Sequence, residues 1–250
     1  MTNTSNKQAV DKLIFALDAA AYDEALSWID LLSGHVGMFK VGKELFTACG
    51  PKIIEEIKSR QQKVFLDLKF HDIPNTVARA ACAAVRLHVD MFNVHAAGGS
   101  KMIHETAEAI EAAAMEVCVT KPVMLAVTVL TSLNDEDLGQ IGFQKNAGEL
   151  VLHLAVLAQA AGAAGVVASP QEIEILRRHL PADFVIVTPG IRASAASSGD
   201  DQKRTLSAFE AVKAGADYIV VGRPIRAAAR PLEVCRRIVD EIAAALPARG

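Results

Sequence analysis

Lysines and aspartates that end apolar segments are the residues of this chain best suited to chemistry. Asp67, Lys69 and Asp72 follow one such segment, Lys40 falls inside another, and Asp18 ends a third. Residues two apart on a strand face the same side, so we expect Asp67 and Lys69 side by side, with Asp72 in the turn beyond. An isolated buried charge is very costly, and here each charge has neighbours of the opposite sign. The pattern therefore predicts an alternating array of ammoniums and carboxylates made by Lys40, Asp67, Lys69 and Asp72.

An array of this kind has two interpretations. A structural ion-pair network at the end of a strand is the better explanation of any single member. The whole set, with Asp18 at the same end of the fold, is better explained as a functional site, because paired charges with perturbed pKa values cluster at such sites.

A glycine and an arginine, Gly222 and Arg223, directly follow the apolar segment Tyr218–Val221 near the end of the chain. Glycine lets backbone N–H groups approach an anion, and arginine adds a planar, permanently charged group. Barrels built from βα units often bind phosphate after their last strands. We therefore expect a phosphate site at this glycine-arginine pair. Thr131, Ser132 and Arg192 also follow apolar segments.

The segments that must position these residues alternate between short apolar runs and longer alanine-rich stretches with helical spacing. Such alternation is typical of repeated βα units and a parallel sheet. The predicted strands are Leu13–Leu17, Met38–Val41, Lys63–Leu68, Met91–Val94, Val123–Val129, Gly165–Ala168, Phe184–Thr188 and Tyr218–Val221. The predicted helices are Tyr22–Leu32, Gly50–Arg60, Thr76–Leu87, Lys101–Ala114, Ala147–Ala161, Gln171–His179 and Leu206–Ala214. Eight units favour a closed (β/α)₈ TIM barrel over a doubly wound open sheet, in which the same alternation occurs.

The length and composition fit one such barrel. The chain has 250 residues, of which 51% are hydrophobic and 22% charged, so it can bury a large core. No stretch rich in proline, glycine and serine is long enough to separate two domains. We expect a single domain over residues 1–250, with residues 1–10 as a flexible N-terminal segment.

The composition also argues against several classes of partner. A net charge of −3 with mixed signs provides no basic field for a nucleic acid. The four cysteines are far apart, as in a protein with reduced thiols, and the seven histidines lack the spacing of metal ligands. Residues 150–168 are mostly apolar, but His153, Gln159, Gly162 and Gly165 interrupt them, so a buried segment is expected rather than a membrane span. The first ten residues lack the pattern of a signal peptide, and we expect a cytoplasmic protein.

The sequence resembles the orotidine 5′-phosphate decarboxylase family, bacterial type, from Leu13 to about Ile238. The most specific match is the segment from Phe65 to Thr76, FLDLKFHDIPNT. Supporting matches lie at Ala16 to Asp18, Phe39 to Lys43, Val129 to Ser132, Val187 to Arg192, Gly199 to Gln202 and Val221 to Arg223.

The resemblance implies a homodimeric barrel that decarboxylates orotidine 5′-monophosphate to UMP, in de novo pyrimidine biosynthesis, without a cofactor or a metal. It implies that Lys69, Asp67 and Lys40 act together with Asp72 of the neighbouring subunit, and that Thr76 also reaches across the interface. The implied substrate-binding residues are Asp18 and Lys40 at the ribose, Thr131 and Ser132 at the pyrimidine, and Gln202, Gly222, Arg223 and Arg192 at the phosphate, together with Asp72, Ile73, Thr76 and Pro189.

Two other functions fit the same residues. One is a magnesium-dependent decarboxylase or aldolase of keto-sugar phosphates, which shares the Asp-x-Lys-x-x-Asp pattern and would require Mg²⁺. The other is an inactive barrel that binds a nucleotide and serves as an interaction scaffold, which would bind UMP without turnover. The intact set of Lys40, Asp67, Lys69 and Asp72 favours an active enzyme over the scaffold.

Overall fold

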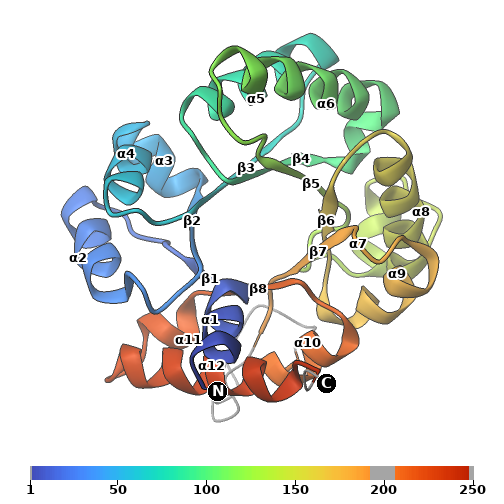
Figure 1. Cartoon of the computed structure of the whole chain (residues 1–250). Helices are drawn as coiled ribbons and strands as arrows, with labels where there is room; N and C mark the ends of the chain where they lie inside the picture. The colour runs from blue at the N-terminus through green and yellow to red at the C-terminus, as the bar shows by residue number, and fades with distance from the viewer. Residues whose placement is uncertain (1, 192–205, 248–250) are drawn as a thin grey trace.

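The eight strands close into a parallel barrel in the order in which they occur in the sequence. The computed structural model describes residues 2–191 and 206–247. The strands are β1 (Leu13–Ala16), β2 (Met38–Gly42), β3 (Val64–Phe70), β4 (Met91–His95), β5 (Val123–Val127), β6 (Gly165–Val167), β7 (Val185–Thr188) and β8 (Tyr218–Val221). β1 pairs with both β2 and β8, which closes the ring and excludes the open sheet. Figure 1 shows the ring of strands with the helices outside it.

The helices cover the outer face of the barrel. They are α1 (Thr2–Lys12), α2 (Tyr22–Leu32), α3 (Lys43–Cys49), α4 (Lys52–Ser59), α5 (Pro74–Arg86), α6 (Gly99–Glu116), α7 (Asp135–Gln140), α8 (Ala147–Ala160), α9 (Ile173–His179), α10 (Ala208–Ala214), α11 (Arg223–Arg226) and α12 (Pro231–Ala245). Two short 3₁₀ helices, η1 (Ala96–Gly98) and η2 (Pro170–Glu172), follow β4 and β6. The predicted barrel is therefore confirmed, with every predicted strand present.

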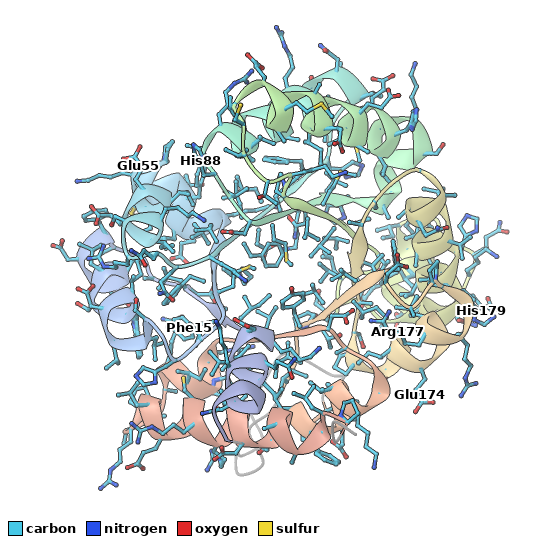
Figure 2. All side chains as sticks on the ribbon, viewed as in Figure 1. Phe15, Glu55, His88, Glu174, Arg177 and His179 are labelled. Atoms are coloured by element: carbon cyan, nitrogen blue, oxygen red, sulfur yellow. The ribbon has the colours of Figure 1, made fainter. Side chains whose placement is uncertain are left out.

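The alternation of side chains along the strands separates two apolar cores. One set, which includes Ile14, Met38, Phe65 and Leu125, fills the inside of the barrel. The alternate residues, such as Phe15, belong to the larger core between the strands and the helices. Figure 2 shows Phe15 in that outer layer, whereas Glu55, Glu174 and His179 lie on the outside of the helical ring. Because these side chains pack together inside the barrel, we expect the site at one of its ends.

The N-terminal segment forms helix α1 over residues 2–12, where the sequence predicts a flexible segment for residues 1–10. Ala9 is fully buried in the core, and α1 packs against α12. Lys12 at its end donates a hydrogen bond of 3.0 Å to the backbone carbonyl of Asp217, directly before β8. The burial of Ala9 and the hydrogen bond of Lys12 explain why this segment is helical and packs against the rest of the domain.

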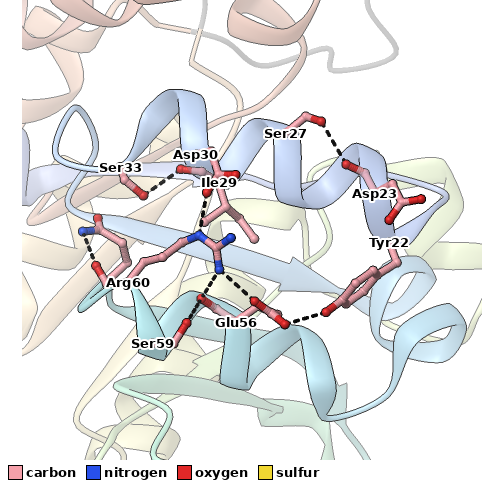
Figure 3. A network of polar contacts seen from close by, with 10 residues as sticks. Tyr22, Asp23, Ser27, Ile29, Asp30, Ser33, Glu56, Ser59 and Arg60 are labelled. Carbon is pink, nitrogen blue, oxygen red and sulfur yellow. Dashed lines mark hydrogen bonds and ion pairs between the residues drawn. The ribbon is translucent and has the colours of Figure 1, made fainter.

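A polar network on the outer face attaches α2 to α4 (Figure 3). Arg60, just after α4, donates to Asp30 on α2 at 2.6 Å and to Glu56 at 2.8 Å. The hydroxyl of Tyr22, the first residue of α2, donates to Glu56 at 2.6 Å. Because α2 begins four residues after Asp18, this network holds the segment that follows the first strand.

Candidate active site

A cavity of about 280 Å³ lies at the C-terminal ends of the strands. Reactive groups in barrels of this kind come from this end and from the loops after it. Its lining includes eight of the residues expected from the sequence, which are Asp18, Lys40, Asp67, Lys69, Thr131, Pro189, Gly222 and Arg223. The rest of the lining is largely apolar, with Phe65, Val127 and Val167 below and Ile191 at one side. The cavity thus combines an apolar floor with charged walls, as small-molecule sites do.

Four charged side chains form a continuous chain of contacts across one wall. Lys40 Nζ lies 3.5 Å from Asp18 Oδ1 and 3.1 Å from Asp67 Oδ2. The other oxygen of Asp67, Oδ1, lies 2.6 Å from Lys69 Nζ. Strands β1, β2 and β3 are neighbours, so three separate parts of the sequence meet here. The alternation of carboxylate and ammonium expected from the sequence is present, with Asp18 as its first member.

The electrostatics of the array follow from its burial. The side chains of Asp67 and Lys40 are only 11% and 13% exposed. Burial alone would lower the pKa of Lys40, but the carboxylates of Asp67 and Asp18 outweigh it and hold this pKa above its ordinary value. Burial alone would raise the pKa of Asp67, but the ammoniums of Lys40 and Lys69 outweigh it and hold this pKa below its ordinary value. Both groups therefore stay charged across the neutral range.

Asp72 does not join the array in this chain. It lies in the turn after β3, where its carboxylate accepts a hydrogen bond of 2.6 Å from the N–H of Ile73. Within the described residues it makes no ion pair with Lys40 or Lys69. Asp72, Ile73 and Thr76 are all exposed, and Ile73 is 66% exposed despite its large apolar side chain. The sequence analysis expects Lys40, Asp67, Lys69 and Asp72 to meet. In this chain, Lys40, Asp67 and Lys69 do so and Asp72 does not.

The other expected residues lie around the rim. Thr131 and Pro189 line the cavity beyond β5 and β7, and Ser132 is exposed beside Thr131. Gly222 and Arg223 line the cavity after β8, which lies beside β1 and three strands away from β5. A Cβ atom on Gly222 would lie 3.0 Å from Ala16 Cβ and 3.3 Å from Asp18 Oδ2, so the absence of a side chain lets β8 approach Asp18. Arg192 and Gln202 fall outside the described residues.

The sequence analysis did not select two polar residues of β4, which are Asn93 in the lining of the cavity and His95, whose ring is close enough to Lys69 and Asp67 for their charges to act on it. Asn93 lines the cavity and is 1% exposed, and its amide contacts Asp67. His95 ends the same strand, with its ring centroid 5.2 Å from that of His71. Burial, together with the charges of His71, Lys69 and Lys43, lowers the pKa of His95 to about 4. The signal was present in the sequence, because Asn93 and His95 occupy alternate, polar positions in an otherwise apolar strand.

Among the described residues, no three His, Cys, Asp or Glu side chains are grouped as a metal site would require. No helix in residues 2–191 and 206–247 is long and apolar enough to cross a bilayer.

Comparisons with known proteins agree with this geometry. Residues 11–238 match the model of the orotidine 5′-phosphate decarboxylase / HUMPS family. The orotidine 5′-phosphate decarboxylase of Syntrophus aciditrophicus (strain SB) is 56% identical over 251 aligned positions, which cover 100% of both chains. That of Citrifermentans bemidjiense is 51% identical and covers 96% of this chain and 99% of its own. The crystal structure of the orotidine 5′-phosphate decarboxylase from Lactobacillus acidophilus superimposes with a TM-score of 0.82 at 36% identity, over 92% of this chain and 98% of the other. The chain belongs to the orotidine 5′-phosphate decarboxylase / HUMPS family.

Proposed function

We propose that this protein decarboxylates orotidine 5′-monophosphate to UMP in pyrimidine biosynthesis. The observation that carries the proposal is the position of Lys69, whose ammonium lies on the wall of the cavity 2.6 Å from a buried carboxylate of Asp67. Relatives that are more than 50% identical over at least 96% of the chain, such as those from Syntrophus and Citrifermentans, carry the name of this activity.

The reaction needs a group that stabilises negative charge at one carbon. When the bond between C6 of the pyrimidine and its carboxylate breaks, CO₂ leaves and the electron pair remains on C6 in the plane of the ring. Enzymes at the upper end of the usual range supply about 23 kcal/mol of transition-state stabilisation, and a reaction this slow needs about that much. A proton donor alone contributes about 10² to 10⁴ in rate, so most of the stabilisation has to be electrostatic.

In the proposed mechanism, Lys69 supplies both the charge and the proton. Its ammonium stabilises the developing carbanion and then transfers a proton to C6, and a proton from solvent restores the lysine. Asp67 holds this ammonium in place, and Lys40 keeps Asp67 ionised by its own contact of 3.1 Å. Because the array is already assembled and largely buried, little reorganisation is needed when charge develops.

The remaining polar residues divide the substrate among them. We assign Asp18 and Lys40 to the ribose and Thr131, Ser132 and Pro189 to the pyrimidine end. Gly222 and Arg223 are assigned to the phosphate, together with Arg192 and Gln202 from the residues that the structure does not describe. Energy from binding the distant phosphate then contributes to the rate at C6.

We propose that the protein is a homodimer in which Asp72 and Thr76 complete the site of the neighbouring subunit, beside Ile73. Asp72 lies apart from the array of its own chain, and the exposed side chain of Ile73 next to it would be covered in such an interface. A cytoplasmic location is also proposed, because Cys49, Cys82, Cys118 and Cys235 are all free, as in a reducing compartment.

The test is the loss of the absorbance of orotidine 5′-monophosphate after addition of the purified protein in EDTA. The expected result is rapid conversion to UMP, identified by chromatography. Conversion only after Mg²⁺ is restored would instead support a metal-dependent reaction of the same family. No conversion under either condition, with UMP still binding in calorimetry, would overturn the proposal in favour of an inactive nucleotide-binding barrel.

A further inference from the structure

The amide side chain of Asn93 on the neighbouring strand β4 connects Asp67 and Lys69 of the array. Asn93 Nδ2 donates a hydrogen bond of 2.7 Å to Asp67 Oδ1, the oxygen that also contacts Lys69 Nζ. Asn93 Oδ1 accepts a hydrogen bond of 2.8 Å from the backbone N–H of Lys69. The amide of Asn93 therefore contacts the main chain of Lys69 and the side chain of Asp67.

The backbone of Lys69 has a conformation that needs such support. Its φ is 52°, in the left-handed region that residues with a side chain rarely adopt. Pairing between β3 and β4 is irregular at this place, because Leu66 pairs with Phe92 whereas Phe70 pairs with Val94. Three residues of β3 thus lie opposite one residue of β4. Conformations of this kind cost about 1–3 kcal/mol and persist only where surrounding contacts impose them.

The irregularity also explains why the N–H of Lys69 needs a partner that is a side chain. In a regular ladder the N–H groups of β3 bond to carbonyls of the next strand, and a bulge interrupts this pattern. The N–H of Lys69 bonds instead to the side chain of Asn93, the residue of β4 between the two paired positions. This contact satisfies a partly buried donor, which would be costly to leave unpaired.

The two partners also determine the orientation of the amide. A backbone N–H can only donate, so the oxygen of Asn93 must face Lys69, and an ionised carboxylate can only accept, so the nitrogen must face Asp67. Asn93 is 1% exposed and lies inside the barrel, so water cannot replace either contact without a rearrangement.

We propose that Asn93 is a positioning residue for the decarboxylation, which holds the left-handed backbone of Lys69 and the carboxylate of Asp67 in one arrangement. The inference rests on the proposed function and adds a role to a residue that does not itself contact the reacting carbon. Without Asn93, the β3 bulge relaxes and the ammonium of Lys69 leaves its place beside Asp67. With Asn93 present, the ammonium of Lys69 is already beside Asp67 before the substrate binds.

The first test compares Asn93→Ala with a matched control, Thr106→Val. Thr106 is also fully buried and donates a side-chain hydrogen bond of 2.7 Å, but it lies on α6 and does not line the cavity. Because a misplacement of about 1 Å in a catalytic group can cost about 100-fold, Asn93→Ala should lower kcat by about that factor and change KM for orotidine 5′-monophosphate by less than about fivefold. Thr106→Val should lower the melting temperature and leave kcat unchanged. A kcat of Asn93→Ala within about threefold of the wild type would overturn the inference.

A second variant, Asn93→Asp, provides a readout that a merely structural role would not affect. At neutral pH its carboxylate can still accept from Lys69 but repels Asp67. When protonated, it can donate to Asp67 and accept from Lys69 as the amide does. A carboxyl beside a second carboxylate takes up its proton well above its ordinary pKa, so the ratio of kcat in Asn93→Asp to kcat in the wild type should rise about tenfold as the pH falls from about 8 to about 5.

The other charged or titratable groups around Asp67 are Lys40 from β2, Lys69 from β3, His95 from β4 and Asp18 after β1. All are present in both proteins, so the ratio reports the new carboxyl together with its coupling to these groups. A ratio that is flat with pH would contradict the role assigned to Asn93, even if Asn93→Ala proved too unstable to assay.

A third measurement does not depend on turnover. Hydrogen exchange of the Lys69 amide, followed by NMR, should be much faster in Asn93→Ala than in the wild type, while the amides of α6 keep their rates. Unchanged exchange at Lys69 would show that Asn93 does not hold this backbone. An inactive wild type would refute the proposed function alone, whereas an active wild type with an unaffected Asn93→Ala would refute only the present inference.

Discussion

The ammonium of Lys40 lies 3.1 Å from one oxygen of Asp67, while the ammonium of Lys69 lies 2.6 Å from the other. One buried carboxylate therefore compensates two lysines that belong to different strands. Asn93 donates a further hydrogen bond to the same carboxylate, at 2.7 Å. Since a buried charge without a partner is far more costly than a pair, Asp67 is the member on which both lysines of the array depend.

Asp67→Asn should destabilise the protein, because it leaves Lys40 with only Asp18 at 3.5 Å and Lys69 without a carboxylate. Removal of one partner from a buried pair costs about 3–5 kcal/mol, and we expect a loss near the lower limit at pH 7. Urea unfolding measures the difference. The double variant Lys40→Met/Asp67→Asn should recover part of the stability, because it also removes one of the uncompensated ammoniums.

The sign of the pH dependence follows from the lowered pKa of Asp67. Its contribution to stability is complete above the ordinary pKa of 3.8 and is lost as the pH falls through the lower value of the folded protein. The difference between wild type and Asp67→Asn should therefore be constant from pH 5 to 8 and shrink only below about pH 3.8. A difference that already shrinks at pH 6 would contradict the depressed pKa.

Lys69→Ala should abolish turnover while nucleotide binding stays measurable. The substitution removes the group that stabilises the carbanion and protonates C6, and a loss of at least about 10⁴ in kcat/KM is expected if both contributions disappear. Calorimetry with UMP should show binding within about tenfold of the wild type. The control is Lys101→Ala, which removes a lysine that is 80% exposed on α6. Near-normal activity of Lys69→Ala would make the proposed mechanism wrong.

The alternation of apolar and alanine-rich segments predicts the barrel because each βα unit repeats the same local pattern. The limits of Tyr218–Val221 and Tyr22–Leu32 are those of β8 and α2. Helix α3 was missed because it starts at Lys43, directly after β2, without a polar segment to separate the two. The spacing of Asp67 and Lys69 predicts their contact.

The same spacing does not predict the left-handed backbone of Lys69, because that conformation depends on the pairing of β3 with β4. The role of Asn93 was missed for the same reason, since its partners lie 24 and 26 residues away in the sequence. Asp72 is a third residue whose contacts could not be predicted from its spacing in the sequence. Its spacing suggests a place in the array, but in one chain its carboxylate bonds to the adjacent N–H of Ile73.

Arg223→Ala should chiefly raise KM, because Arg223 lies on the cavity wall at the end assigned to the phosphate. Hydrogen bonds to charged groups contribute about 1.5–3 kcal/mol, so KM should rise about 10- to 150-fold. Steady-state kinetics with orotidine 5′-monophosphate provides the measurement. Arg230→Ala is the control, since Arg230 pairs with Glu233 at the start of α12 and is 76% exposed. An unchanged kcat/KM would move Arg223 out of the phosphate site.

Gly222→Ala should impair ribose binding through Asp18. The new Cβ would lie 3.0 Å from Ala16 Cβ and 3.3 Å from Asp18 Oδ2, so either β1 or Asp18 has to shift. We expect KM to rise and the melting temperature to fall by a few degrees, as a cost of about 1 kcal/mol does in a chain of this size. The double variant Gly222→Ala/Ala16→Gly should restore the melting temperature. Gly139 lies on α7, where a Cβ would meet nothing within 4 Å, so Gly139→Ala should neither raise KM nor lower the melting temperature.

The low pKa of His95 predicts how stability responds to mild acid. Its folded value of about 4 lies below the ordinary 6.5, mainly because of burial and then because of the charges of His71, Lys69 and Lys43. The unfolded chain therefore binds this proton more readily than the folded one, so His95 lowers stability progressively as the pH falls from 6.5 towards 4. The ring is only partly buried, so solvent screening reduces the size of the effect.

Two measurements follow for His95. In an NMR titration, its ring protons should show a midpoint near pH 4. The melting temperature of His95→Gln should fall less between pH 6.5 and pH 4 than that of the wild type, because the substituted side chain takes up no proton. A midpoint near 6.5 would mean that neither burial nor the charges of His71, Lys69 and Lys43 lower the pKa of this ring, and the fall in melting temperature would then be the same in both proteins. Since His95 is neutral above pH 5, its substitution should also leave the shape of the pH profile of kcat unchanged from pH 6 to 8.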